Sequence, residues 1–363
     1  MRLMGAQTNK SGGDFLQETK ERPLSAALLR GLFLALALAV LALTLVPRAA
    51  AAEQKPRMVI PLGQAVGIKL FSQGVLVVGL TDITTEQGLA SPAKACGIRT
   101  GDVITHINDA QVSSIEEVQT ILQDLSGREM ELNVLREEEQ LELTTRAAQC
   151  SADGAYKLGA WIRDSMAGIG TLTFVEPATG LFGTLGHGIN DVDTSVLMKL
   201  QTGAITPASV VGIVKGEDGR PGELRGAFTA GEDLGKLFAN TQQGVFGYLT
   251  ENDTFTGTPI PVAEPEEIRE GKATILSNVE GTQVEEYAVE IIKICHNATD
   301  TRDLMLKVTD QRLLEKTGGI VQGMSGSPIV QNGKLVGAVT HVLVNDPTRG
   351  YGIFIENMLE AAE

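Results

Sequence analysis

The chain has 363 residues, long enough for more than one domain with its own hydrophobic core. Those cores must be largely aliphatic, because 43% of the residues are hydrophobic and only 4% are aromatic. The formal net charge of −15 argues against nucleic-acid binding, which needs a basic surface to neutralise phosphates. Three cysteines without a C-x-x-C pair and four scattered histidines argue against a zinc site. At most one disulfide can form, and whether Cys150 pairs with Cys295 is left open.

The N-terminal region is predicted to tether the chain to a membrane. Residues 24–46 are mostly apolar and carry no charge apart from Arg30, and basic residues precede them in the segment 1–23. This apolar length lies between a signal-peptide core and a full membrane span. The positive-inside rule keeps the segment 1–23 in the cytoplasm and exports everything that follows. We expect a transmembrane anchor rather than a cleaved signal, although "PRAAAAEQ" in the linker 47–57 offers an A-x-A cleavage pattern.

Residues 58–147 predict a small α+β domain. "SPAKACGIRTGDVITHIND" is followed by "SSIEEVQTILQDL", whose apolar residues fall at helical spacing after a serine N-cap, Ser113 or Ser114. This unit resembles the PDZ domains attached to exported bacterial proteases. Such a domain binds a peptide as an added strand on an exposed sheet edge. The resemblance assigns the peptide-binding loop and edge strand to Gly67, Ile68, Lys69 and Leu70.

Residues 148–363 predict a mainly β domain. Short apolar runs such as "GIGTLTFVEP", "ASVVGIVKG" and "EEYAVEIIKI" are separated by Gly and Pro, which favours a barrel or sandwich. "QRLLEKTG" indicates one short helix that ends at Gly318. The segment after it, "SPIVQNGKLVGAV", is typical of a hairpin with its turn at Asn332 and Gly333.

Ser325 in "GMSGSP" is a candidate nucleophile. Gly323 and Gly326 let the backbone adopt a tight turn that presents the serine. In such a turn the N–H groups of Gly323 and Ser325 converge to form an oxyanion hole. The stretch resembles the nucleophile turn of chymotrypsin-like serine proteases, and the alternative is a turn serine without chemistry. The second strand of the hairpin places Thr340 and His341 in the wall of the predicted cleft.

A serine nucleophile needs a base, and His187 is the leading candidate. It is flanked by glycines in "GLFGTLGHGIND" and precedes Ser325 in the order of the chymotrypsin triad. His341 is the alternative base. The orienting acid stays open between several carboxylates, since spacing does not choose among Asp191, Asp193, Asp233 and Asp310, the last of which also suits a helix N-cap.

Four stretches of the sequence resemble the stage IV sporulation protein B peptidase family. The longest is "TGGIVQGMSGSPIVQNGKLVGAVTHVLVNDPTRGYGIFIENM", and the others are "FGTLGHGI", "GRPGELRGAF" and "NTQQGVFGYL". The resemblance extends from about residue 24 to the C-terminus. It implies a multi-domain chain with a transmembrane helix, a PDZ domain and a chymotrypsin-like serine peptidase domain. It also implies that Ser325 is the nucleophile, His187 the base and Asp310 the acid, without a metal or organic cofactor.

The same resemblance implies a place and a set of partners. Family members are anchored in the forespore membrane and face the space between forespore and mother cell. They cleave themselves and then a membrane-embedded regulatory protein, which leads to activation of a late sigma factor. Two other functions fit the residues: a tethered PDZ scaffold without activity, and a general exported quality-control protease.

Overall fold

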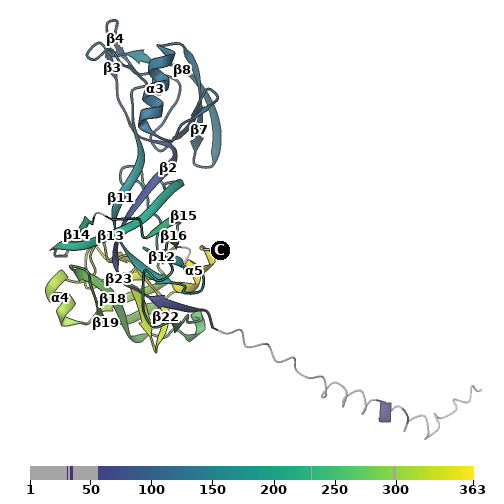
Figure 1. The fold of residues 1–363 in the computed structure, drawn as a ribbon, viewed down its shortest axis with the longest axis vertical. Helices are drawn as coiled ribbons and strands as arrows, with labels where there is room; N and C mark the ends of the chain where they lie inside the picture. The colour runs from purple at the N-terminus through teal and green to yellow at the C-terminus, as the bar shows by residue number, and fades with distance from the viewer. Residues whose placement is uncertain (1–30, 32, 36–55, 230, 297–299) are drawn as a thin grey trace, which may run out of the picture. The chain divides into compact units, whose positions relative to one another are not determined.

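The computed structural model describes residues 31, 33–35, 56–229, 231–296 and 300–363 (Figure 1). Most of the predicted membrane segment 24–46 therefore lies outside the described residues. In the part of the chain that is described, no helix is both long enough and apolar enough to cross a membrane. Residues 56–363 form one compact unit.

The first barrel closes because one long strand pairs on both of its sides. β2 hydrogen-bonds to β11 along one side and to β13 along the other, and β12, β16 and β15 complete the ring. Glycines such as Gly183 and Gly247 let the aromatic side chains of Phe174 and Phe182 fill the interior, where an added Cβ would collide with them. The strands of the ring are β2 (Ala65–Leu80), β11 (Ala160–Val175), β12 (Leu181–Thr184), β13 (Leu200–Val214), β15 (Gly235–Thr241) and β16 (Gly244–Leu249). Three strands pair at its margins: β1 (Met58–Pro61), β14 (Glu223–Phe228) and β17 (Ile260–Pro261).

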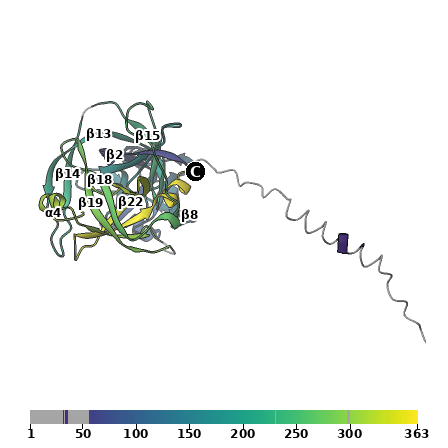
Figure 2. The same cartoon turned by 90° about the horizontal axis from the view of Figure 1, so that it is seen from below.

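The second barrel is closed and antiparallel, and Figure 2 looks onto it from below. Its core is largely aliphatic, as the composition predicted, with Tyr287 as the largest fully buried side chain. The strands are β18 (Gly271–Glu280), β19 (Gln283–Ile294), β20 (Leu304–Val308), β21 (Pro328–Gln331), β22 (Lys334–Val342) and β23 (Arg349–Phe354). Three short helices accompany it: η1 (Pro265–Glu267), α4 (Gln311–Thr317) and α5 (Ile355–Glu360). The predicted short helix and the Asn332–Gly333 turn are both confirmed.

The predicted PDZ unit has one main helix beside a small sheet (Figure 1). Helix α3 (Ile115–Leu125) begins at Ser114, whose side chain accepts from the Glu117 N–H in a capping box. Val118 and Leu122 of this helix are buried against the sheet. The remaining elements are β3 (Ile83–Thr85), β4 (Gly88–Ala90), α2 (Pro92–Ala95), β5 (Val103–Ile107), β6 (Ala110–Gln111), β7 (Glu129–Arg136), β8 (Glu139–Arg146), β9 (Ala148–Gln149) and β10 (Tyr156–Lys157).

The boundaries of the PDZ unit differ from the predicted range 58–147. β1 and the first half of β2 pair with strands of the first barrel, so residues 58–71 belong to that barrel. The core of the PDZ unit begins at Val75 and extends past residue 147 to Leu158, with Ile162 packed against it. β2 and β11 therefore run through both units as one pair of strands (Figure 1).

The assignment of Gly67 to Leu70 as the peptide-binding loop is wrong for the same reason. These residues lie inside β2, where β11 occupies one edge and β13 the other. Gly67 faces Ile169 on one side and Thr206 on the other. A strand whose two edges are both paired has no free backbone groups for a peptide.

The cysteines carry no crosslink within the described chain. Cys96, Cys150 and Cys295 are all free thiols. Cys150 is buried in the PDZ unit, whereas the other two are half buried. Whether Cys150 and Cys295 pair was left open by the sequence, and in this structure they do not.

Candidate active site

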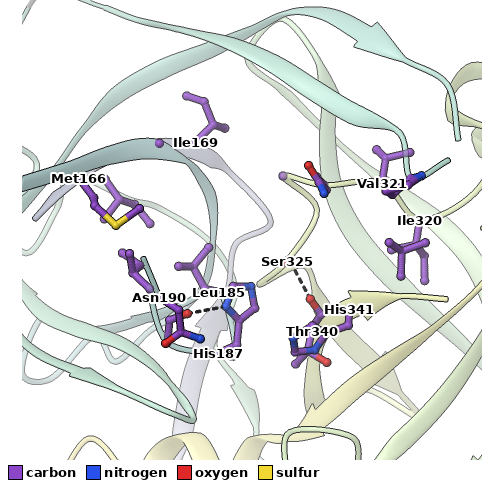
Figure 3. A pocket seen from close by; sticks show the side chains of 18 of the residues that line it. Met166, Ile169, Leu185, His187, Asn190, Ile320, Val321, Ser325, Thr340 and His341 are labelled. Carbon is purple, nitrogen blue, oxygen red and sulfur yellow. Dashed lines mark hydrogen bonds between the residues drawn. The ribbon is translucent and has the colours of Figure 1, made fainter. Parts of the chain in front are cut away.

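A pocket of about 490 Å³ lies between the two barrels. The first barrel contributes Met166–Ile169 of β11 and the residues around His187 after β12. The second barrel contributes Ile320–Gly323, Ser325 and Thr340–Val342. Figure 3 shows Ser325, His187 and His341 grouped together in this pocket. The two residues predicted for the cleft wall, Thr340 and His341, line it.

The Ser325 turn is held by a strand of the other barrel. Gly323 and Gly326 have φ angles of +95° and +96°, in the left-handed region that favours glycine. A Cβ on Gly326 would lie 2.1 Å from the Thr171 carbonyl oxygen, so no other residue fits there. The Thr171 hydroxyl donates to the Gly323 carbonyl at 2.8 Å, and its N–H donates to the Ser325 carbonyl at 3.3 Å. Thr171 therefore fixes the turn on both sides of Met324.

Two backbone N–H groups of this turn remain available. Within the described chain, neither the N–H of Gly323 nor that of Ser325 donates a hydrogen bond, whereas the N–H groups of Met324 and Gly326 are both paired. Both unpaired groups belong to residues that line the pocket. Free N–H donors beside a serine hydroxyl are the arrangement that stabilises an oxyanion.

His187 enters the pocket from a strained turn at the end of β12. Leu185 and Gly186 have φ angles of +69° and +67°, which reverse the chain directly before the histidine. The Nδ1 atom lies 2.8 Å from the Gly188 carbonyl oxygen. A carbonyl only accepts, so Nδ1 carries the proton and Nε2 is left as the base. Burial lowers the pKa of His187, and the bond to Gly188 partly offsets that effect.

His341 lies beside His187 in the same pocket. Their ring centroids are 5.1 Å apart, with the planes tilted by 37°. Desolvation, followed by the neighbouring His187, lowers the pKa of His341 to about 4. Both rings are therefore neutral at pH 7, and two neutral imidazoles tolerate this proximity without charge repulsion.

The Ser325 hydroxyl does not point at His187 in this structure. It donates to the Thr340 carbonyl oxygen at 2.7 Å (Figure 3). The Thr340 side chain in turn donates to the Thr301 carbonyl at 2.9 Å. The hydroxyl proton is thus held by the Thr340 carbonyl, and it must leave this acceptor before a base removes it.

Asp310, predicted as the triad acid from the family resemblance, is not brought to His187. It is the N-cap of α4, and its carboxylate accepts from the N–H groups of Ala288 at 3.2 Å and Arg312 at 3.0 Å. The Arg312 guanidinium also binds both carboxylate oxygens, and it lowers the pKa of Asp310. The hydrogen bonds of this carboxylate therefore go to the start of the helix and to β19.

None of the other candidate acids contacts His187 either. Asp191 is buried and binds Arg163 of β11 together with the backbone of its own loop. Asp193 binds the same arginine, and Asp233 is not among the residues of the pocket. In this structure the Gly188 carbonyl, rather than a carboxylate, orients the ring of His187.

Two positioning residues were not found by sequence reasoning. Thr171 holds the nucleophile turn, as described above. Asn240 of β15 holds the loop after His187: its Oδ1 accepts from the Ile189 N–H at 2.8 Å. Its Nδ2 donates to the carbonyls of Ile189 and Met198 at 3.0 and 2.8 Å. Neither residue carries a local signal, because a threonine in a strand and an asparagine near a turn are ordinary features.

Two family models match this chain. Residues 154–359 match the family described as SpoIVB peptidase S55, and residues 84–136 match a PDZ domain. No curated protein matches the chain. Among solved structures, it is similar to the active form of the Rv3671c protease from M. tuberculosis, at 15% identity over 55% of this chain and 75% of that one, with a TM-score of 0.30. It is also similar to the thermostable serine protease AL20 from an extremophilic microorganism, at 14% identity over 55% of this chain and 91% of that one, with a TM-score of 0.31.

Proposed function

Because the chain belongs to the SpoIVB peptidase S55 family and is a serine endopeptidase, we propose that Ser325 and His187 perform its chemistry in sporulation signalling. The observation that carries this proposal is the pocket in which Ser325, His187 and two free N–H groups meet. The two barrels each supply one reactive side chain, as in other proteases that use a serine and a histidine.

The proposed reaction follows from the hydrogen bonds of the pocket. After Ser325 rotates away from the Thr340 carbonyl, His187 Nε2 takes the hydroxyl proton while Oγ bonds to the substrate carbonyl carbon. The N–H groups of Gly323 and Ser325 bind the oxyanion. His187 then gives its proton to the leaving amine as the C–N bond breaks, and water hydrolyses the acyl-enzyme by the reverse sequence of proton transfers.

In this proposal a Ser–His pair works without a carboxylate beside the ring. The Gly188 carbonyl fixes the tautomer, which is one of the two roles that a triad aspartate performs. It does not supply the negative charge that stabilises an imidazolium. The lowered pKa of His187 agrees with this, because no neighbouring anion favours its charged form.

The biological role is proposed from the family resemblance. We propose that the chain is anchored by residues 24–46 with its catalytic part outside the cytoplasm, at the forespore membrane. Its substrates are then itself and a membrane-embedded regulatory protein, whose cleavage leads to activation of a late sigma factor. The apolar N-terminal segment and the PDZ match support this reading.

A fluorophosphonate probe tests the peptidase proposal directly. We expect covalent labelling at Ser325 of the wild-type protein, and no labelling of Ser325→Ala or His187→Ala. Expression of the full chain is expected to give a self-cleaved product that is absent from Ser325→Ala. A tethered scaffold without activity, in which Ser325 only bonds to the Thr340 carbonyl, would give neither the covalent adduct nor the self-cleaved product.

A second assay separates the signalling peptidase from a quality-control protease. The wild-type protein is incubated with casein and with a panel of folded exported proteins. A signalling peptidase is expected to cut few sites in few proteins, and degradation of casein together with most of the panel would favour the broader enzyme.

A further inference from the structure

β11 has one paired side and one open side along most of its length. β1 and β2 follow one side of it from Val175 to Ala160. β12 covers the opposite side, but its pairing begins only at Leu172. Within the described chain, no strand pairs with that opposite side between Ala160 and Gly170. A row of backbone groups next to a catalytic pocket is thus open for strand addition.

The open side of β11 leads to the nucleophile. Thr171 donates its N–H to the Ser325 carbonyl, so Ser325 lies on the side that β2 does not occupy. The register with β2 is continuous from Ser165 to Thr171. Because alternate residues of a strand point their N–H groups to the same side, those of Ile169 and Ala167 also face away from β2. Both residues line the pocket.

The other end of the same edge lies in the PDZ unit, beside helix α3. The Ile115 N–H at the start of the helix donates to the Asp164 carboxylate at 3.0 Å. Near its end, the Gln123 side chain exchanges two hydrogen bonds with the backbone of Tyr156, each 3.2 Å long. The helix is therefore fixed alongside residues 156–164. A strand edge beside a helix is how PDZ domains take up peptides, and β2 cannot provide it because both of its edges are paired.

The surface beside this edge suits an extended chain. Ile162 of β11 is a partly exposed apolar side chain that packs on the PDZ core. Ala167 and Gly168 are exposed, and a Cβ on Gly168 would meet nothing within 4 Å. The small residues allow a neighbouring backbone to approach closely where the edge enters the pocket.

We propose that the edge of β11 from Ala160 to Ile169 binds one extended segment of the protein substrate and leads it from the PDZ unit to Ser325. The inference rests on the proposed peptidase function, because the occupant is the chain to be cleaved. At about 3.3 Å per residue the edge is roughly 30 Å long, which accommodates about ten substrate residues. Recognition is mainly through the backbone, with the side chains beside α3 preferring apolar partners.

The chain carries a built-in probe for this docking. Trp161 is its only tryptophan, lies on β11 and is 65% exposed. The test uses the full-length Ser325→Ala protein with reduced, carboxymethylated ribonuclease A, an unfolded chain that contains no tryptophan. Binding is expected to shift the Trp161 emission to shorter wavelength and to slow amide exchange in residues 160–169 about tenfold or more.

A pair of variants on α3 locates the contact. Gln119→Glu places a charge on the helix row of Ile115 and Gln123, which faces residues 156–164, and is expected to weaken binding about tenfold or more, which corresponds to 1.4 kcal/mol. Thr120→Glu adds the same charge at an exposed position away from that row and is the matched control. An equal loss in the two variants, or protection of amides elsewhere than on β11, would overturn the proposal.

The outcome is separable from that of the peptidase proposal. If wild-type protein is labelled at Ser325 and cuts the unfolded chain, but Ser325→Ala shows no protection on β11, the docking edge is refuted and the peptidase stands. If residues 160–169 are protected and the wild-type serine is never labelled, the peptidase proposal fails and the docking edge stands as the surface of a scaffold.

Discussion

Replacing Asp310 separates a catalytic acid from a helix cap. Asparagine is as good an N-cap as aspartate, so Asp310→Asn keeps the bond to the Arg312 N–H while removing the negative charge. Alanine removes the cap, the acceptor of the Ala288 N–H and the ion pair together. The structure therefore predicts two different responses from one position. Asp310→Asn gives up the ion pair and one oxygen acceptor, so it should keep the wild-type activity with a smaller loss of stability than Asp310→Ala.

The magnitudes follow from the contacts. The ion pair is worth roughly 0–1 kcal/mol, because the Arg312 side chain is 59% exposed. Loss of an N-cap costs about 0.5–2 kcal/mol, and the unpaired Ala288 N–H adds about 1 kcal/mol. Asp310→Ala should thus lower the melting temperature by roughly 3 to 8 °C. A triad acid would respond differently, since its replacement by asparagine lowers kcat about 10⁴-fold.

The assay is the rate of fluorophosphonate labelling at Ser325, with the melting temperature measured on the same samples. We expect Asp310→Asn to label within about threefold of the wild-type rate, far from the 10⁴-fold loss of a missing acid. Ser114→Ala, which removes the cap of α3 in the PDZ unit, controls for stability loss away from the pocket. A drop of about a thousandfold or more in Asp310→Asn at unchanged melting temperature would show that this carboxylate reaches His187 during catalysis and would refute the cap assignment.

Four further predictions concern the pocket. Thr171→Val removes the hydroxyl bonded to Gly323 and should slow fluorophosphonate labelling of Ser325 about tenfold, which is equivalent to one lost hydrogen bond of about 1.4 kcal/mol. An unchanged labelling rate would show that this hydroxyl does not hold the nucleophile turn. Gly326→Ala should abolish labelling of Ser325, because the added Cβ would collide with the Thr171 carbonyl oxygen. Gly333→Ala is the control: its φ is also positive but its Cβ would meet no atom, so it should lower the free energy of unfolding, measured with urea, by only about 1 kcal/mol. Between pH 7.5 and pH 6 the labelling rate should fall by less than the roughly fourfold loss of an ordinary imidazole of pKa 6.5, because burial lowers the pKa of His187. His187 and His341 bind protons less readily in the folded than in the unfolded protein, because burial lowers the pKa of both. The free energy of unfolding should therefore fall as the pH drops below about 6.5. A rise, measured by urea unfolding, would contradict the burial argument.

Local sequence signals predicted local structure well. The serine N-cap with Glu117 three residues later marked the start of α3, and Gly318 marked the end of α4. Asn332 and Gly333 set the hairpin turn with two positive φ angles. Each of these features is decided by residues within one turn of the chain, so the sequence carries the full physical cause. The SpoIVB peptidase resemblance is also confirmed by the family match.

The PDZ boundary failed because its cause is not local. "GIKLFSQGVLVVGL" alternates as two strands would, with Gly74 at the point where a turn is expected. In the structure Gly74 has a φ of +90°, yet β2 continues through it as one strand. Its first half is held by β13, more than a hundred residues later in the chain. Whether a chain turns or continues at such a glycine depends on the partners available on each side.

The active site shows the same division. Glycine context identified Ser325 and His187 as candidates for one pocket, and the structure places both there. Spacing left the acid open, and the family resemblance selected Asp310, which the structure places at the start of α4 instead. Thr171 and Asn240 act by holding loops that are distant in sequence, so no short motif contains them.

β11 is the element through which the two units of this protein act on one site. Arg163 binds Asp191 and so ties the PDZ end of the strand to the loop that follows His187. Further along the same strand, Thr171 holds the Ser325 turn. A substrate segment paired along β11 would thus contact the strand that positions both reactive side chains.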